Sequence, residues 1–195
     1  GYESDRNRLC VYELATGKKN YVSDKFDSNV EGFVWNKDNK SLSFIGVWHG
    51  TLNLYQANFK GEVKQITNEW ADYGSISLAN NGNKLLATKA SMSHPTDIYI
   101  VTPGKNAKST KVEQITREND HILNQLNMGK CEQRWVKTTD GKQMLVWIML
   151  PSNFDANKKY PTLLFCEGGP QSPVSQFWSY RWNIQIMAAN GYVVV

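Results

Sequence analysis

The sequence is poor in cysteine and lacks the cysteine patterns of metal centres. Its 195 residues include three cysteines, Cys10, Cys131 and Cys166, without a CxxC pair. A metal site needs more ligands at closer spacing, so we predict that the chain binds no metal. The odd count argues against a disulfide framework, although a single disulfide stays open. Cys166 lies inside an apolar run, and we expect it to be buried as a small hydrophobic residue.

The sequence also lacks a long apolar run and a cluster of basic residues. No hydrophobic stretch approaches the length of a membrane span, which argues against a membrane-spanning protein. The net charge is +4, but the lysines are dispersed and most stand beside turn residues. A nucleic-acid-binding protein more often gathers its basic residues on one face, among aromatic side chains. We therefore predict that the chain binds no nucleic acid.

Repetition is the main positive feature of the first two-thirds of the chain. A strand, a polar turn and a second strand are expected over 33–44, and the same pattern recurs over 76–87. This places Trp35 and Leu78 at equivalent positions, 43 residues apart. The following strands keep nearly the same spacing and contain Tyr12, Tyr55 and Tyr99.

A third landmark, the tripeptide Gln-Ile-Thr, occurs at 65–67 and again at 114–116. Its offset is 49 residues because the turn over 103–109 is longer. A period of about 40 to 50 residues with four short strands is typical of a propeller blade. A β-sandwich with accidental similarity is the alternative, but three landmarks in one register favour the propeller. We therefore assign 1–120 to the C-terminal blades of a β-propeller and expect its other blades upstream of Gly1.

The character of the sequence changes after Thr116. We expect a polar linker over 121–131 and then a hairpin with strands at 132–137 and 143–150, joined by an Asp-Gly turn. A buried strand is expected over 162–166, followed by a glycine loop.

A helix and a last strand are expected after this loop. Trp182, Ile186 and Ala189 keep helical spacing, and Asn190-Gly191 suits a helix end. The strand pattern expected over 192–195 has not ended at the last residue, so we expect the natural chain to continue. The order of elements is typical of the N-terminal part of an α/β-hydrolase domain. We assign 132–195 to it and expect it to stop before the nucleophile elbow.

The glycine loop, residues 167–171, has the sequence Glu-Gly-Gly-Pro-Gln. Acyl transfer needs hydrogen-bond donors aimed at the negative oxygen of a tetrahedral intermediate. In α/β-hydrolases one donor is a backbone N–H from the loop after the third strand, where glycine allows close approach. We therefore predict that Gly168 and Gly169 form an oxyanion loop.

At this point the sequence resembles the prolyl oligopeptidase family of serine peptidases, and most of all its bacterial dipeptidyl-peptidase V and acylaminoacyl-peptidase branch. The resemblance is strongest in the segments Leu-Phe-Cys-Glu-Gly-Gly-Pro-Gln at 164–171 and Gln-Phe-Trp-Ser-Tyr-Arg-Trp-Asn at 176–183. It implies an exopeptidase that releases dipeptides or acylated residues from peptide N-termini, needs no cofactor, and uses its propeller to filter out folded proteins. It also implies that Gly169 donates its N–H to the oxyanion.

Glu167 departs from this resemblance, because family members place His or Tyr before the glycine pair. An ionised carboxylate has no proton to donate, so a side-chain contribution to the oxyanion hole is not expected. One interpretation is that Glu167 pairs with a nearby base such as Arg181 and only shapes the loop. The other is that it binds the N-terminal ammonium of a peptide substrate.

The catalytic triad is absent from the sequence. No GxSxG occurs, and His49, His94 and His121 all precede the hydrolase segment, whereas the triad order of this fold is Ser, Asp, His. We interpret His49 and His94 as turn residues and expect the segment alone to be inactive. The alternative is a non-catalytic propeller binding module with a degenerate hydrolase domain, and a lipase or esterase is a weaker one. By resemblance we expect the protein to be periplasmic or otherwise exported, with the signal upstream of Gly1. A cytoplasmic location and a homodimer stay open.

Overall fold

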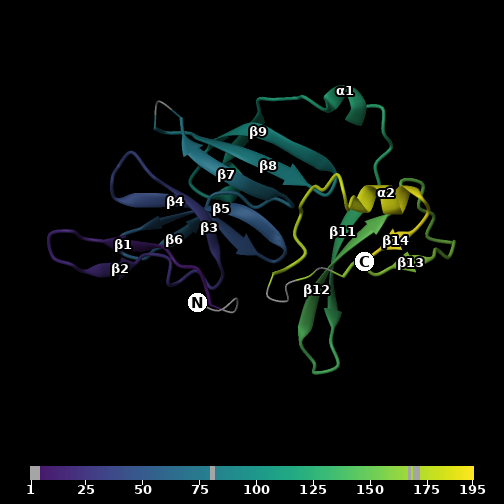
Figure 1. Ribbon diagram of the computed structural model, residues 1–195, viewed down its shortest axis with the longest axis horizontal. Coiled ribbons are helices and arrows are strands. Elements are labelled where there is room, and N and C mark those ends of the chain that lie inside the picture. Colours follow the sequence, from purple (N-terminus) through teal and green to yellow (C-terminus); the bar gives the residue numbers. More distant parts are fainter. Residues whose placement is uncertain (1–4, 80–81, 167, 169–171) are drawn as a thin grey trace.

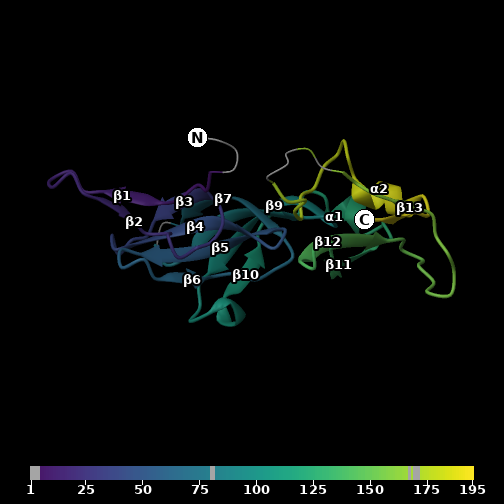
Figure 2. The same ribbon diagram turned by 90° about the horizontal axis from the view of Figure 1, so that it is seen from below.

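The computed structural model describes residues 5–79, 82–166, 168 and 172–195 (Figure 1). The blades of the first part and a smaller C-terminal unit lie towards opposite ends of the long axis, and Figure 2 shows the same separation from a second direction. Among the described residues, no helix is long and apolar enough to cross a membrane.

The first part contains two consecutive four-stranded antiparallel meanders, which are blades of a β-propeller. The strands of the first blade are β3 (Val30–Trp35), β4 (Ser41–Trp48), β5 (Thr51–Asn58) and β6 (Val63–Gln65). Those of the second blade are β7 (Asp72–Leu78), β8 (Leu85–Ser91), β9 (His94–Thr102) and β10 (Lys111–Gln114). A separate two-stranded sheet precedes them, made of β1 (Cys10–Tyr12) and β2 (Lys19–Tyr21).

The strand registers confirm the sequence repeat. Trp35 pairs with Leu42 at the end of β3, and Leu78 pairs with Leu85 at the end of β7, so the two predicted landmarks are equivalent. The outer strands agree as well, because Gln65 lies opposite Tyr55 in one blade, and the corresponding pair in the next blade is Gln114 and Tyr99. The longer turn between these strands contains a short 3-10 helix, Ala107–Ser109.

A buried threonine explains why the tripeptide Gln-Ile-Thr recurs. The Thr67 hydroxyl accepts a hydrogen bond from the Leu54 N–H at 2.9 Å and donates one to Asn53 Oδ1, also at 2.9 Å. In the next blade the Thr116 hydroxyl accepts from the Ile98 N–H at 2.9 Å and donates to Asp97. Each hydroxyl thus satisfies a backbone donor that the short outer strand leaves without a ladder partner.

Side-chain packing holds the two blades together. Their backbones share one parallel bridge, between Leu52 of β5 and Asp72 of β7. A buried cluster crosses the gap between the sheets, with Ile45 and Leu54 from the first blade against Tyr73 and Leu85 from the second. A second cluster lies inside the first blade and includes Leu9, Val22, Phe26, Phe44 and Tyr55.

The C-terminal unit is a four-stranded sheet with the strand order β11-β12-β14-β13. A connection with a short helix, α1 (Asp120–Leu123), leads from the blades to the hairpin of β11 (Lys130–Lys137) and β12 (Gln143–Leu150). The strand β14 (Val193–Val194) runs antiparallel to β12 and parallel to β13 (Thr162–Leu163). The helix α2 (Ile184–Ala189) packs on β12 and β14. The predicted order of hairpin, strand, helix and strand is therefore present, and β11 begins two residues earlier than expected.

The burial predicted for the strand over 162–166 is wrong. The strand is shorter, and Cys166 is exposed instead of being a buried hydrophobic residue. The reason is that β13 lies at the edge of the sheet, with β14 as its neighbour. Leu164, which follows β13, is 73% exposed. All three cysteines are free in this structure, and Cys10 is exposed as well.

The predicted apolar stripe of the helix is also the wrong one. Asn183 caps α2 by accepting a hydrogen bond from the Gln185 N–H at 2.9 Å, so that Trp182 lies before the helix. Ile186 is exposed, and the buried face carries Ile184, Gln185 and Ala188. A polar Gln185 can be buried because its amide is fully occupied by hydrogen bonds, as described below.

Candidate active-site loop

Three residues, 164–166, separate β13 from the predicted oxyanion loop. Gly168 lies in a bend, and a Cβ placed on it would meet no atom within 4 Å. Glu167 and Gly169, the other two predicted site residues, lie outside the described residues. The open space beside Gly168 is compatible with a ligand approaching the backbone at this point.

After the glycine loop in the sequence, the anchoring segment, residues 172–177, contacts the propeller. The Ser175 hydroxyl donates a hydrogen bond to Asp72 Oδ2 at 2.5 Å, and the Gln176 N–H donates to Asp72 Oδ1 at 3.1 Å. The Leu52 N–H donates to the same Oδ1 at 3.2 Å. Because Asp72 is also the residue that bridges β7 to β5, one carboxylate joins both blades to the anchoring segment.

Partial burial and hydrogen bonding act on Asp72 in opposite directions. Burial raises the pKa of this carboxyl above its ordinary value, and the donors from Ser175, Gln176 and Leu52 offset part of that effect. Little solvent reaches the Asp72 carboxylate to replace these donors. Its ionised form is therefore destabilised if the donors move away.

The side chain of Gln176 attaches the same segment at two further points. It is 2% exposed, and its Oε1 accepts a hydrogen bond from the Met92 N–H at 3.4 Å in the turn between β8 and β9. Its Nε2 donates to the Cys131 thiol at 3.6 Å, and burial raises the pKa of that thiol. The anchoring segment therefore contacts a propeller strand, a propeller turn and the first strand of the C-terminal unit.

Gln185 makes a similar attachment for α2. Its Oε1 accepts from the Gly129 N–H at 2.7 Å, and its Nε2 donates to the Ser93 hydroxyl at 2.8 Å. A Cβ on Gly129 would lie 2.3 Å from the Leu150 carbonyl oxygen, so this contact needs glycine. The helix is thereby fixed to the connecting segment and to the same β8–β9 turn that binds Gln176.

Aromatic residues fill the rest of the junction. The rings of Trp70 and Trp147 meet edge to face with centroids 5.3 Å apart. Gly50 has a φ of +66°, and a Cβ there would lie 2.6 Å from the Trp147 Nε1 and 3.1 Å from the Val174 carbonyl oxygen. The turn between β4 and β5 therefore lies against the anchoring segment without room for a side chain. An apolar cavity of about 360 Å³ adjoins it, lined in part by Met92, Trp147 and Phe165.

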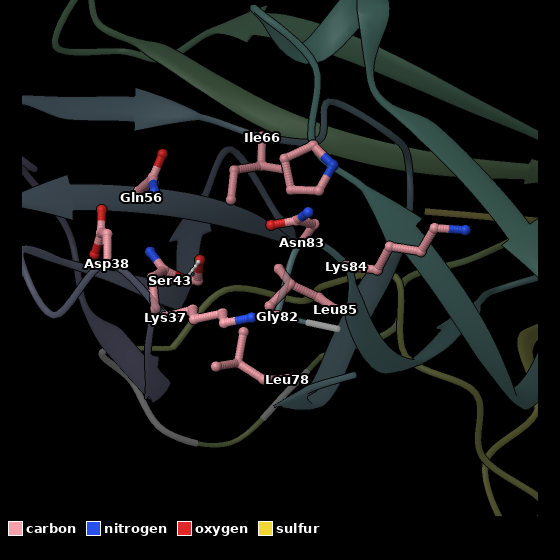
Figure 3. A pocket seen from close by; sticks show the side chains of 12 residues that line it. Lys37, Asp38, Ser43, Gln56, Ile66, Leu78, Gly82, Asn83, Lys84 and Leu85 are labelled. Atoms are coloured by element: carbon pink, nitrogen blue, oxygen red, sulfur yellow. Dashed lines mark hydrogen bonds between the residues drawn. The ribbon is translucent and has the colours of Figure 1, made fainter. Parts of the chain in front are cut away.

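Figure 3 shows the side chains that line a second cavity, of about 240 Å³, within the blades. It is lined by residues of the β3–β4 and β7–β8 turns, among them Lys37, Asp38 and Lys84. Polar residues in its lining have hydrogen-bond partners: Asp38 accepts from the Ser41 hydroxyl at 2.8 Å, Gln56 donates to the same hydroxyl at 3.1 Å, and the Ser43 hydroxyl donates to Asn36 at 2.8 Å. These groups are used in holding the turns, so this cavity has a structural explanation.

His94 is not the turn residue that the sequence suggested, because it is the first residue of β9. Its Nδ1 lies 2.8 Å from the Pro95 carbonyl oxygen, and its Nε2 lies 3.8 Å from Asp120 Oδ1. Asp97 completes a group whose polar atoms lie within 4.8 Å of one another. Both oxygens of Asp97 already accept hydrogen bonds, from Thr116 and from Gln114, and the contact of His94 with Asp120 joins β9 to α1. His49 does lie in a turn, with a φ of +50°.

No family model matches the chain. It is 45% identical over its whole length to dipeptidyl-peptidase 5 of Porphyromonas gingivalis, and 31% identical over 99% of its length to dipeptidyl-peptidase 5 of Schizosaccharomyces pombe. It spans only 28% and 27% of these relatives, respectively.

A solved structure with the same fold is an acylaminoacyl peptidase in complex with Z-Gly-Gly-Phe-chloromethyl ketone. The TM-score is 0.78 at 21% identity, and the match covers 98% of this chain and 28% of the other. The fold match includes the blades and extends through almost all of the C-terminal unit. The chain is thus similar in sequence to dipeptidyl-peptidases 5 and in fold to an acylaminoacyl peptidase, which supports its resemblance to a fragment of a prolyl oligopeptidase-family peptidase.

Proposed function

We propose that the chain is a segment of a serine-type exopeptidase that releases dipeptides or acylated residues from the N-termini of peptides. The observation that carries this proposal is the 45% identity to a protein named dipeptidyl-peptidase 5, which extends over the entire chain. The segment contributes propeller blades and a loop beside the reaction centre. No cofactor takes part, because the chemistry is nucleophilic catalysis by serine. Export from the cytoplasm, to the periplasm in a bacterial cell, is part of the proposal.

We divide the segment into three parts on the basis of its strand order. Residues 1–120 form blades, 121–131 form the linker, and 132–195 form the start of an α/β-hydrolase domain. The support for the last assignment is the parallel pair β13 and β14, which is followed along the sheet by the antiparallel hairpin, with the glycine loop after β13. Ligands of open α/β sheets bind beyond the carboxyl ends of the strands, and this loop follows the carboxyl end of β13 in the sequence.

Gly169, with Gly168 beside it, is proposed as the oxyanion-binding part of this segment. The backbone N–H of Gly169 would donate to the negative oxygen of the tetrahedral intermediate. The second donor and the triad would come from other parts of a longer parent protein. The open space at Gly168 supports access to this backbone.

The experiment that tests the proposed function uses a parent protein with the length of the relatives. Peptides with a free N-terminus, N-acylated peptides and simple esters are offered, and the released products are identified by mass spectrometry. Release of dipeptides or acylated residues, blocked by a serine-directed fluorophosphonate, supports the proposal. Binding of peptides without cleavage supports a non-catalytic propeller module, and cleavage of esters alone supports a lipase or esterase.

The chain of 195 residues by itself is expected to show no peptidase activity. The reason is that it contains no GxSxG turn, and two of its serines near the glycine loop have structural partners: Ser175 donates to Asp72, and the Ser179 hydroxyl accepts from the Trp182 N–H at 2.9 Å. Incubation with a fluorophosphonate probe checks this. Covalent labelling of Ser172, Ser175 or Ser179 would contradict the expectation.

Glu167→Gln in the parent protein distinguishes the two interpretations of this residue. If the carboxylate binds the substrate ammonium, KM for free-amino substrates should rise about tenfold, since a charge-assisted hydrogen bond is weakened. KM for N-acylated analogues should stay nearly unchanged, because they carry no charge at that position. Equal changes on both substrate types, or a lower melting temperature with unchanged KM, would show that Glu167 only shapes the loop.

A further inference from the structure

Asp72 is the point at which three separate segments of the chain share one side chain. It is the first residue of β7, it pairs with Leu52 across the boundary between the blades, and it binds the anchoring segment 103 and 104 residues further along. Its two oxygens accept from two backbone N–H groups and one hydroxyl. A carboxylate is suited to this task because it has acceptor sites on both oxygens and no donor to satisfy.

The attachment lies close to the glycine loop in sequence. Ser175 follows the end of that loop by four residues, and Pro173 stands between them. Proline restricts the backbone, so an attachment at Ser175 and Gln176 limits the positions that the preceding residues can take. The Gln176 side chain adds two contacts, with the buried Met92 and the half-buried Cys131, so this end of the segment is held by three separate parts of the chain.

Displacements of the oxyanion loop that are no longer than these hydrogen bonds are enough to affect the rate of catalysis. An oxyanion donor works only if it already points at the place where the charge develops, and a shift of about 1 Å can cost about a hundredfold in rate. A loop with two adjacent glycines has little conformational restriction of its own. Its orientation must therefore be supplied by the residues that fix its ends, and on the C-terminal side these include Ser175 and Gln176.

We propose that Asp72 is a positioning residue for the peptidase reaction: from the propeller it holds Ser175 and Gln176 and so orients the oxyanion loop over 168–169. This inference rests on the proposed function. It assigns to the propeller a direct part in the geometry of the reaction centre, in addition to filtering substrates. Because the same carboxylate binds Leu52, a change in the fit between the two blades would be transmitted to the loop.

The test compares four variants of the parent protein. Asp72→Ala removes all three acceptor contacts, while Asp72→Asn keeps an oxygen for the two backbone donors and offers an amide to the Ser175 hydroxyl. Ser175→Ala removes one contact and leaves the carboxylate in place, so it serves if Asp72→Ala does not fold. Asp38→Ala is the matched control, because Asp38 also accepts three hydrogen bonds within the propeller, from the Lys40 N–H and from the N–H and hydroxyl of Ser41.

Asp72→Ala should lower kcat by about tenfold to a hundredfold with KM changed less than about threefold, and slow fluorophosphonate labelling to a similar extent. Asp72→Asn should restore most of this rate, Ser175→Ala should show a smaller loss, and Asp38→Ala should match the wild type in kcat. Hydrogen exchange over 172–177 should accelerate most in Asp72→Ala, less in Ser175→Ala, and not at all in Asp38→Ala. A folded Asp72→Ala or Ser175→Ala with wild-type kcat, even at a lower melting temperature, would overturn the inference. A wild-type parent without peptidase activity would instead contradict the proposed function.

Discussion

Gly169→Val in the parent protein is expected to lower kcat by about a hundredfold or more, as for the loss of an oxyanion-hole donor. The proposed donor is a backbone N–H, which the substitution leaves in place chemically. The β-branched side chain acts by restricting the backbone and by occupying the space through which the substrate carbonyl must approach. The measurement is kcat on a dipeptide-releasing substrate, together with the rate of fluorophosphonate labelling.

Gly168→Ala is the control for this prediction. A Cβ at Gly168 meets no atom within 4 Å, so the protein tolerates it sterically, and the loss of kcat should be much smaller than for Gly169→Val. Melting temperatures show whether either variant is misfolded. A Gly169→Val enzyme with kcat within a factor of two of the wild type would remove Gly169 from the oxyanion site.

The largest expected effect on stability is that of Phe44→Ala, about 3–5 kcal/mol in the free energy of unfolding. Phe44 is 0% exposed, and its ring lies 5.4 Å from that of Phe26 and 5.5 Å from that of Tyr55. Truncation removes the buried ring and leaves a cavity that the surrounding strands can fill only in part. Urea unfolding, followed by the fluorescence of the blade tryptophans, measures the change.

Phe33→Ala provides a closely matched control. Phe33 lies directly opposite Phe44 in the pairing of β3 with β4, but it is 55% exposed. Its truncation should cost less than about 1 kcal/mol, as for most exposed positions. Similar losses for both phenylalanines would mean that β3 is covered by a further blade in the intact propeller.

The sequence predicted the blades well because their repeat is made by local chemistry. Equivalent positions such as Trp35 and Leu78 reflect equal strand and turn lengths, and the threonines at 67 and 116 satisfy equivalent backbone donors. Which of two facing phenylalanines is buried could not be predicted in this way. It depends on the neighbouring sheet, and alternation within one strand contains no information about that neighbour.

The candidate site was predictable only in part. The glycine loop stands out by composition, and its place after a strand was predicted correctly. The role of Asp72 could not be predicted from the sequence, because it binds residues more than a hundred positions away. Nothing in the pattern around it distinguishes it from other acidic residues near strands. The helix face was mispredicted for a related reason. Trp182 and Ile186 look like a core stripe, but a buried glutamine with distant partners occupies the inner face.

The long turn between β9 and β10 has a consequence for the evolution of length in this chain. It adds residues relative to the corresponding turn after β5, yet the pairing of Gln114 with Tyr99 keeps the register of Gln65 with Tyr55. The extra residues are absorbed by the 3-10 helix at Ala107–Ser109, which Asn106 caps, and none of them enters the ladder. Selection can therefore lengthen or shorten this surface turn without altering the strands beneath it, and orthologues are expected to differ in length at this turn before they differ within the blades.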